Sequence, residues 1–292
     1  MSPNGRTLLT ATQTSNGTEI WQMDSNGRSP HVLLSCEDAQ CDHLVWHPDG
    51  RRLLYERREL ATPNLPHLWW LDGETGESRP LQTNPNGPSQ AARFSSDGMW
   101  VSFVTSPDQG IEFYHFGDGR RFTIPAEMGT PAIWQPGNET FIYRNHQLVV
   151  EHGADDGDHQ THTHDFVTGV YLFVGDVDGR TGAPISSGVV DDGAPAFSPD
   201  GEWLALGRTL PQTDLGRQLW LMRPDGRDAR PLTDEPTIHH GLPTWSPDGR
   251  YLLYQRYDTQ GENDRAAIWM VEIATGNQTQ ISATGFLPSW QP

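Results

Sequence analysis

Short apolar runs with alternating polar positions recur along the chain, and a turn sequence separates the two runs of each pair. The segment from Leu242 to Leu253 shows the pattern without interruption, as Leu-Pro-Thr-Trp-Ser-Pro-Asp-Gly-Arg-Tyr-Leu-Leu. Proline presets φ and glycine accepts positive φ, so Pro-Asp-Gly favours a tight turn. The alternating runs on either side predict antiparallel strands, and each motif is therefore predicted to form a β-hairpin.

The hairpin motif is one half of a longer repeat. Its unbroken copies, the third in a weaker form, are Trp46–Gly50, Phe94–Gly98, Trp134–Asn138, Phe197–Gly201 and Trp245–Gly249. A second apolar and aromatic run follows each of these five copies, at 68–72, 112–116, 170–174, 219–222 and 268–271, and a sixth run of this kind lies at 19–24. Each of these runs leads into a Gly-bearing turn and a short fourth strand. Four short antiparallel strands in about 45 residues are typical of one blade of a β-propeller.

A sixth copy of the motif is split between the two ends of the chain. It starts as Leu287-Pro-Ser-Trp-Gln-Pro292 and resumes at Ser2-Pro-Asn-Gly-Arg-Thr-Leu-Leu9. We therefore expect an all-β fold, a six-bladed propeller forming a single domain over residues 1–292, in which residues 286–291 pair with residues 6–12 and close the ring. The expected blades cover residues 1–35 with 286–292, 43–83, 91–125, 131–187, 194–233 and 242–282.

These motifs resemble the repeats of the TolB-like β-propeller family, whose units read much like Phe-Ser-Pro-Asp-Gly-Glu-Trp-Leu-Ala at Phe197–Ala205. The resemblance extends over essentially the whole chain and is specific for the fold. It implies one of three kinds of function: a periplasmic protein-binding module, the gating domain of a prolyl-oligopeptidase-type peptidase, or an oligogalacturonate lyase. A fold of this kind does not decide among them.

Composition narrows the function classes. The formal net charge of −18 argues against a nucleic-acid partner, because phosphate neutralisation needs a basic face. All twenty basic residues are arginines, so lysine nucleophiles and Schiff bases are excluded. No run of eighteen apolar residues and no signal-peptide pattern is present, so we expect no membrane span. Separately, we expect the protein to be a monomer.

Two cysteines, Cys36 and Cys41, are separated by four residues. They favour either a local disulfide, which would place the protein outside the cytosol in an extracytoplasmic or periplasmic compartment, or two free thiols. With His43 nearby a zinc site is conceivable, although the chain lacks a second cysteine pair at zinc spacing.

One connection differs from the others in length and composition. Between Asn145 and Thr168 the fourth blade carries more than twenty residues, with an acidic and histidine-rich centre at 153–165. Its ends alternate, which predicts a long projecting hairpin. Imidazoles at alternate positions of one strand could bind one divalent metal ion, so the candidate ligands are His159, His162, His164 and Asp165. The alternative is a solvated polar loop that binds nothing specific.

A second candidate site comes from aligning the blades. Seven residues after each turn glycine the second strand ends in a polar residue, and in three blades this residue is an arginine: Arg57, Arg208 and Arg256. Arginine can grip a carboxylate or phosphate with two hydrogen bonds, so a ring of arginines could bind a small anion, with His239 and His240 on the same face. The alternative is structural, with each arginine within 4 Å of a protein carboxylate.

No motif of a serine hydrolase, zinc peptidase or nucleotide-binding loop is present. We therefore expect a non-enzymatic module that binds a protein partner or a small anionic ligand with the face bearing the 147–168 hairpin. Two alternatives remain. One is a metal-assisted lyase acting on acidic oligosaccharides, similar to oligogalacturonate lyases. The other is a propeller domain that belongs to a larger sensor or peptidase.

Overall fold

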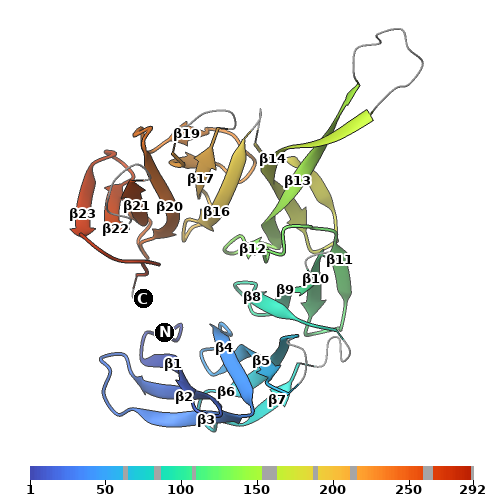
Figure 1. Cartoon of the computed structure of the whole chain (residues 1–292), viewed down its shortest axis with the longest axis vertical. Helices are drawn as coiled ribbons and strands as arrows, with labels where there is room; N and C mark the ends of the chain where they lie inside the picture. The colour runs from blue at the N-terminus through green and yellow to red at the C-terminus, as the bar shows by residue number, and fades with distance from the viewer. Residues whose placement is uncertain are drawn as a thin grey trace. The chain divides into compact units, whose positions relative to one another are not determined.

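The computed structural model describes residues 1–61, 65–81, 87–106, 110–152, 163–186, 190–210, 216–258 and 266–290. The described residues contain strands and turns and no helix (Figure 1). They fall into two compact units, residues 1–139 and residues 140–290. The all-β prediction is confirmed.

The first unit contains three antiparallel sheets, each with its strands in chain order. The first sheet has three strands: β1 (Thr7–Thr14), β2 (Gly17–Asp24) and β3 (His31–Glu37). The second has four: β4 (Ala39–Trp46), β5 (Arg52–Glu59), β6 (His67–Asp72) and β7 (Ser78–Pro80). The third also has four: β8 (Gln90–Phe94), β9 (Trp100–Ser106), β10 (Gly110–His115) and β11 (Arg121–Ile124). The short strand β12 (Ile133–Trp134) follows.

The second unit continues the same pattern. Its first strands are β13 (Thr140–His152), β14 (Thr163–Asp176) and β15 (Thr181–Pro184). A single parallel pair, Val170 with Asp191, joins them to β16 (Asp191–Phe197), β17 (Leu204–Thr209), β18 (Gln218–Met222) and β19 (Arg230–Pro231). A separate four-stranded sheet contains β20 (Ile238–Trp245), β21 (Tyr251–Asp258), β22 (Ala267–Glu272) and β23 (Gln278–Ser282).

The predicted turns form as the motif requires. At the turn before β21, Ser246 Oγ donates to Asp248 Oδ1 over 2.6 Å, and the same oxygen accepts the Arg250 N–H over 3.1 Å. Gly249 has a φ of 70°, a conformation that costs glycine little because it has no Cβ. The aspartate thus satisfies turn groups that the strands leave unpaired.

Sheets within each unit pack face to face, because alternate side chains of a strand point to opposite faces. In β5, Leu53 and Tyr55 belong to a core cluster with Ile20 of β2, whereas Leu54 belongs to another with Phe103 of β9. All five side chains are fully buried. Each inner sheet is therefore buried on both faces by its neighbours, which explains why its strands are apolar on both sides.

A repeated indole hydrogen bond links successive motifs. Trp134 donates its ring N–H to the carbonyl of Arg93 over 3.2 Å, and Trp245 donates to the carbonyl of Ala196 over 2.9 Å. In each case the acceptor immediately precedes the aromatic residue of the previous motif. A tryptophan is therefore favoured at this position for its apolar ring and its donor together.

The C-terminal segment has part of this arrangement. Trp290 donates its ring N–H to the carbonyl of Thr244 over 3.0 Å, as Trp134 and Trp245 do to their acceptors. However, the described residues 283–290 form no strand, and the β1–β3 sheet has three strands. Closure of a ring by residues 286–291 and the count of six blades remain predictions.

Candidate functional site

Each of the three arginines at the ends of second strands lies within 4 Å of a carboxylate. Arg57 donates to Glu59 over 2.6 Å, Arg208 donates to Asp192 over 2.6 Å, and Arg256 donates to Glu235 over 2.5 Å. This is the geometry expected of arginines with a structural role. Arg57 belongs to the first unit and the other two to the second.

Arg208 is the most deeply enclosed of the three, with 7% of its side chain exposed against 0% for its partner Asp192. Two guanidinium nitrogens bind the two carboxylate oxygens, the second over 2.8 Å. Ser186 also donates its hydroxyl to this carboxylate, and the guanidinium lies 4.6 Å from the ring of Trp220. The pair is charge-neutral, bidentate and closed to solvent, so its geometry is that of a tie between β16 and β17.

The two histidines of β20 have different surroundings. His239 stacks on Tyr257 with 5.2 Å between ring centroids and 8° between planes, and its Nδ1 accepts the Arg217 N–H over 3.3 Å. His240 is fully buried, and its Nε2 lies 3.0 Å from Glu235 Oε2. Burial lowers the pKa of both histidines, and the Glu235 carboxylate only partly offsets this for His240.

The lowered pKa of His240 makes stability depend on pH. The unfolded chain protonates its histidines near pH 6.5, about the ordinary value, whereas the native state resists protonation. The free energy of unfolding should therefore be highest above about pH 6.5, where histidines are neutral in both states. Below that pH it should fall, by at most about 1.4 kcal/mol per pH unit for each buried histidine. Urea unfolding of wild type and His240→Gln across this range measures the slope, which we expect to be shallower in the variant. The exposed His31, changed to Gln, is the control; identical slopes for wild type and His240→Gln would contradict the assignment.

Arg144 of β13 and Arg217, just before β18, were not among the candidates from the sequence. Arg144 Nη2 lies 3.7 Å from one oxygen of Asp191, and Arg217 Nη2 lies 3.6 Å from the other. The register alignment missed them because neither occupies the last position of a second strand. The available signal was a pair of glycines inside strands, Gly193 and Gly207, since glycine within a strand often marks a close approach.

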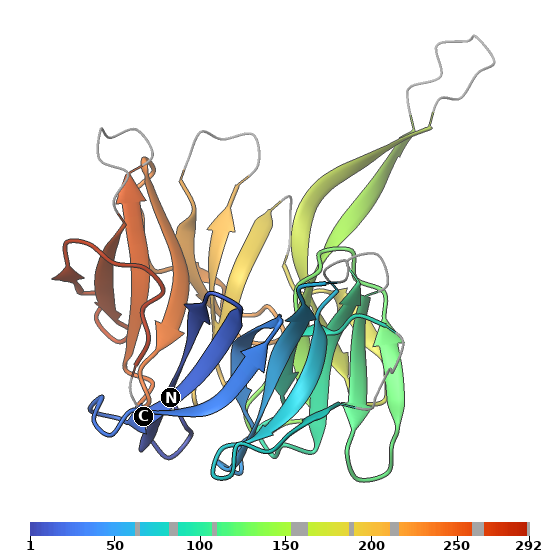
Figure 2. The ribbon, with the colours of Figure 1, turned by 60° about the horizontal axis from the view of Figure 1, so that its bottom comes forward.

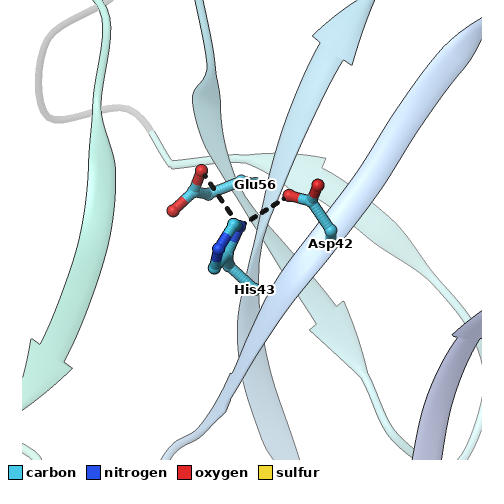
Figure 3. Close-up of side chains that lie close together, drawn as sticks. All are labelled: Asp42, His43 and Glu56. Carbon is cyan, nitrogen blue, oxygen red and sulfur yellow. Dashed lines mark hydrogen bonds and ion pairs between the residues drawn. The ribbon is translucent and has the colours of Figure 1, made fainter. Parts of the chain in front are cut away.

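In the first unit, Asp42, His43 and Glu56 place ligand atoms within 4.8 Å of one another (Figure 3). His43 has a φ of 50° at a bulge of β4, and its Nδ1 lies 2.8 Å from Asp42 Oδ1 and 3.5 Å from Glu56 Oε2. Glu56, in β5, has 3% of its side chain exposed, whereas His43 has 63%. The bulge thus brings an exposed imidazole between two carboxylates.

The surroundings of this cluster test whether it suits a cation. Glu56 Oε2 accepts a hydrogen bond from Arg58 over 2.9 Å, and Oε1 accepts the Ala91 N–H over 2.8 Å. The second Asp42 oxygen lies 3.7 Å from Arg58. A divalent ion at this point would face a guanidinium and displace existing hydrogen bonds, so the residues do not fit a metal ion. They form an ion-pair network that joins β4, β5 and the start of β8.

His159 and His162 lie outside the described residues, and His164 and Asp165 are described only as backbone positions of β14, paired with Glu151 and Val150. The prediction that this segment binds a metal ion stays a prediction.

Cys36 and Cys41 form a disulfide between the end of β3 and the start of β4. Both residues are buried in the same core cluster as Ile20 and Tyr55. The disulfide alternative is therefore the correct one, and the zinc alternative is wrong because a disulfide sulfur is not a thiolate ligand. In the described part of the chain, no helix has the length and apolar character needed to span a membrane.

No protein-family model matches the chain. Among curated relatives, an uncharacterized peptidase YuxL of Bacillus subtilis is 24% identical over 212 residues, which are 63% of this chain and 31% of that protein. The Tol-Pal system protein TolB of Nitratidesulfovibrio vulgaris is 43% identical over 42 residues, 14% of this chain and 9% of that protein. The chain therefore matches less than a third of the length of either relative.

Solved structures match over nearly the whole chain. An oligogalacturonate lyase in complex with manganese has a TM-score of 0.68 at 14% identity, covering 97% of this chain and 75% of the lyase. A puromycin-hydrolyzing peptidase of Mycobacterium tuberculosis has a TM-score of 0.69 at 13% identity, covering 97% and 46%. TolB of Acinetobacter baumannii has a TM-score of 0.59 at 18% identity, covering 98% and 67%. With the antiparallel sheets and repeated turn motifs, these matches show that the chain shares the β-propeller fold of these proteins, TolB among them.

Proposed function

We propose that this chain is a non-enzymatic binding module that presents the face carrying the β13–β14 hairpin to a protein partner. The observation that carries the proposal is the length of this hairpin. Its strands are 13 and 14 residues long, whereas β17, β18, β21 and β22 have 5 to 8. The hairpin extends beyond the neighbouring strands of its own unit (Figure 2).

The outer part of the hairpin adds little to the sheet that carries it. The pairs of β14 with β15 and β16 lie at Val170, Phe173 and Gly175, so among the described strands residues 163–169 of β14 pair with β13 alone. A two-stranded ribbon of this kind is marginally stable in water by itself. A projecting ribbon that is held by a rigid sheet is a common form of recognition element.

Replacing residues 148–168 with an Asn-Gly turn should abolish partner binding and leave the melting temperature nearly unchanged. The turn would join Gln147 to Gly169, which already pair, so the inner hairpin keeps its register. The partner can be captured by cross-linking from an extract of the source organism, then purified and titrated against both proteins. The control is Asn26→Asp in the exposed Asn26-Gly27 turn, which keeps a turn-compatible sequence and should retain binding. Undiminished affinity of the shortened variant, or a large loss of stability, would refute the proposal.

We include in this proposal a ring of six blades, closed by the C-terminal segment. Two features of residues 287–290 support closure. Leu287 has a φ of 47°, close to the 51° of Leu242 and the 48° of Ala194 in the bulges of β20 and β16. Trp290 also repeats the indole hydrogen bond of the earlier motifs. The segment shares the first feature with the innermost strands β16 and β20 and the second with β20, and the β1–β3 sheet has one strand fewer than β4–β7, which supports closure.

The disulfide supports an extracytoplasmic location, because such bonds persist in oxidising compartments. The curated peptidase relative supports the alternative that this propeller belongs to a larger peptidase or sensor, since the match covers under a third of that protein. Immunoblotting of the native protein tests this directly: a species much larger than the 32.6 kDa of this chain would support it.

The second candidate activity is a lyase acting on acidic oligosaccharides. The manganese-bound oligogalacturonate lyase structure favours it, whereas the Asp42–His43–Glu56 cluster does not suit a metal ion. Incubation with trigalacturonate and manganese, followed by ultraviolet detection of an unsaturated product, tests this alternative. Product formation would replace the binding proposal.

A further inference from the structure

The side chains of Arg144 and Arg217 approach each other over the backbone of Gly193, which forms the floor of the site because glycine has no side chain. A Cβ placed on Gly193 would lie 3.3 Å from Arg217 Nη1 and 3.5 Å from Arg144 Nη2. Gly193 pairs across the sheet with Gly207, where a Cβ would come within 2.5 Å of Arg217 Cδ. The two cross-strand glycines therefore let the Arg217 side chain lie flat on the sheet and bring both guanidinium groups over the Gly193 Cα.

The protein only partly satisfies these two guanidinium groups. Their Nε atoms donate to the Asp192 carbonyl over 3.0 Å and to Thr209 Oγ1 over 3.5 Å. Within the described ranges, no hydrogen bond uses a terminal nitrogen of either group. Both face Asp191 at 3.6 and 3.7 Å, beyond ordinary hydrogen-bond length. By contrast, Arg208 binds Asp192 at 2.6 and 2.8 Å.

The local charge is positive within a strongly negative molecule. One carboxylate, that of Asp191, faces two guanidinium groups, while Asp192 is already neutralised by Arg208. Burial, and next the charge of Arg217, lower the pKa of His239, so this histidine does not add to the positive charge at neutral pH. Arg144 and Arg217 keep 21% and 31% of their side chains exposed, so a ligand can reach them. A single negative charge completes the balance, which favours a monovalent carboxylate over a divalent phosphate or sulfate.

We infer that Arg144 and Arg217, over the floor of Gly193, form a binding site for a carboxylate, either that of a small acid or that of a peptide C-terminus. Terminal guanidinium nitrogens match the two oxygens of a planar carboxylate. Asp191 holds the two arginines in place and competes with the ligand. Arg144 lies in the inner part of β13, outside the segment 148–168 that is proposed to bind a protein, and the test of this site does not depend on a protein partner.

The direct test follows the Nε–H resonances of Arg144 and Arg217 by NMR during titration with acetate, with N-acetyl-dialanine and with its C-terminal amide. Arg144→Gln and Arg217→Gln assign the resonances, and each should weaken binding about tenfold or more, as expected for one lost charged hydrogen bond. We expect saturable shifts with the two free carboxylates and none with the amide. Tighter binding of the peptide than of acetate identifies a peptide terminus as the ligand, and equal affinity identifies a small acid.

Two further variants separate a binding site from a structural ion pair. Gly193→Val fills the floor without changing charge and should weaken acetate binding about tenfold. Asp191→Asn removes the competing carboxylate and should strengthen it. The exposed Arg180, tied to Asp176 and Asp178, provides the control as Arg180→Gln, which should bind as wild type does. Absence of saturable shifts, equal shifts with chloride or sulfate at matched ionic strength, or unchanged affinity in both arginine variants would overturn the inference.

Discussion

Changing Arg208 to Ala should lower the free energy of unfolding by about 3–5 kcal/mol, because it would leave the Asp192 carboxylate buried without a counter-ion. Asp192 is completely enclosed, and its two oxygens are bound by Arg208 and Ser186. Urea unfolding at neutral pH measures the loss. The double variant Arg208→Met with Asp192→Leu should recover most of it, since removing both charges removes the uncompensated one.

Arg57 is the matched control for this prediction. It also pairs with a carboxylate, that of Glu59, but 22% of its side chain and 47% of its partner's are exposed. Arg57→Ala should therefore cost about 1 kcal/mol or less. An Arg208→Ala protein as stable as wild type would contradict the structural role and return Arg208 to the set of candidate ligand-binding residues.

Removing residues 286–292 should destabilise the protein by several kcal/mol if this segment supplies the missing inner strand of the first blade. The truncation would expose backbone groups and apolar surface along β1, and it would remove the indole hydrogen bond of Trp290 to Thr244. Thermal unfolding at fixed protein concentration measures the effect.

Two surface residues of the same segment supply the control for the truncation. Phe286 and Leu287 are 73% and 74% exposed, so changing both to Ser should leave the melting temperature nearly unchanged. If the truncated chain also melts at the wild-type temperature, ring closure by the C-terminal segment is wrong. A large loss in the truncation alone would support closure through the backbone of residues 288–291.

The strands and turns were predictable because their causes are local. The Pro-Asp-Gly turns need only a residue that sets φ, a carboxylate that accepts nearby N–H groups, and a glycine, as in the turn at Ser246–Gly249. Alternation along β5 likewise follows from the local backbone, and it places Leu53 and Tyr55 on one face and Leu54 on the other. Repetition of these signals along the chain identified the fold class.

The ion-pair partner and the burial of each charged residue were not predictable in the same way. Arg57, Arg208 and Arg256 occupy equivalent positions in the repeat, yet their carboxylate partners come from the same strand, from a neighbouring strand and from the loop before β20. Because the three arginines have the same position in the repeat, the sequence could not distinguish a buried bidentate arginine–carboxylate pair from an exposed one. Arg144 and Arg217 were missed because their approach depends on two glycines of adjacent strands.

By itself, the sequence determined an all-β chain of repeated antiparallel units, because turn chemistry and alternation act over a few residues. It also limited the partners through its acidic, lysine-free composition. Only the tertiary structure decided that Cys36 and Cys41 form a disulfide. It also showed that Arg58 already pairs with the carboxylates of the Asp42–His43–Glu56 cluster, and that two arginines share the carboxylate of Asp191 over Gly193. These outcomes depend on the distances and burial that the packed strands impose on the side chains, and residue spacing alone does not give either quantity.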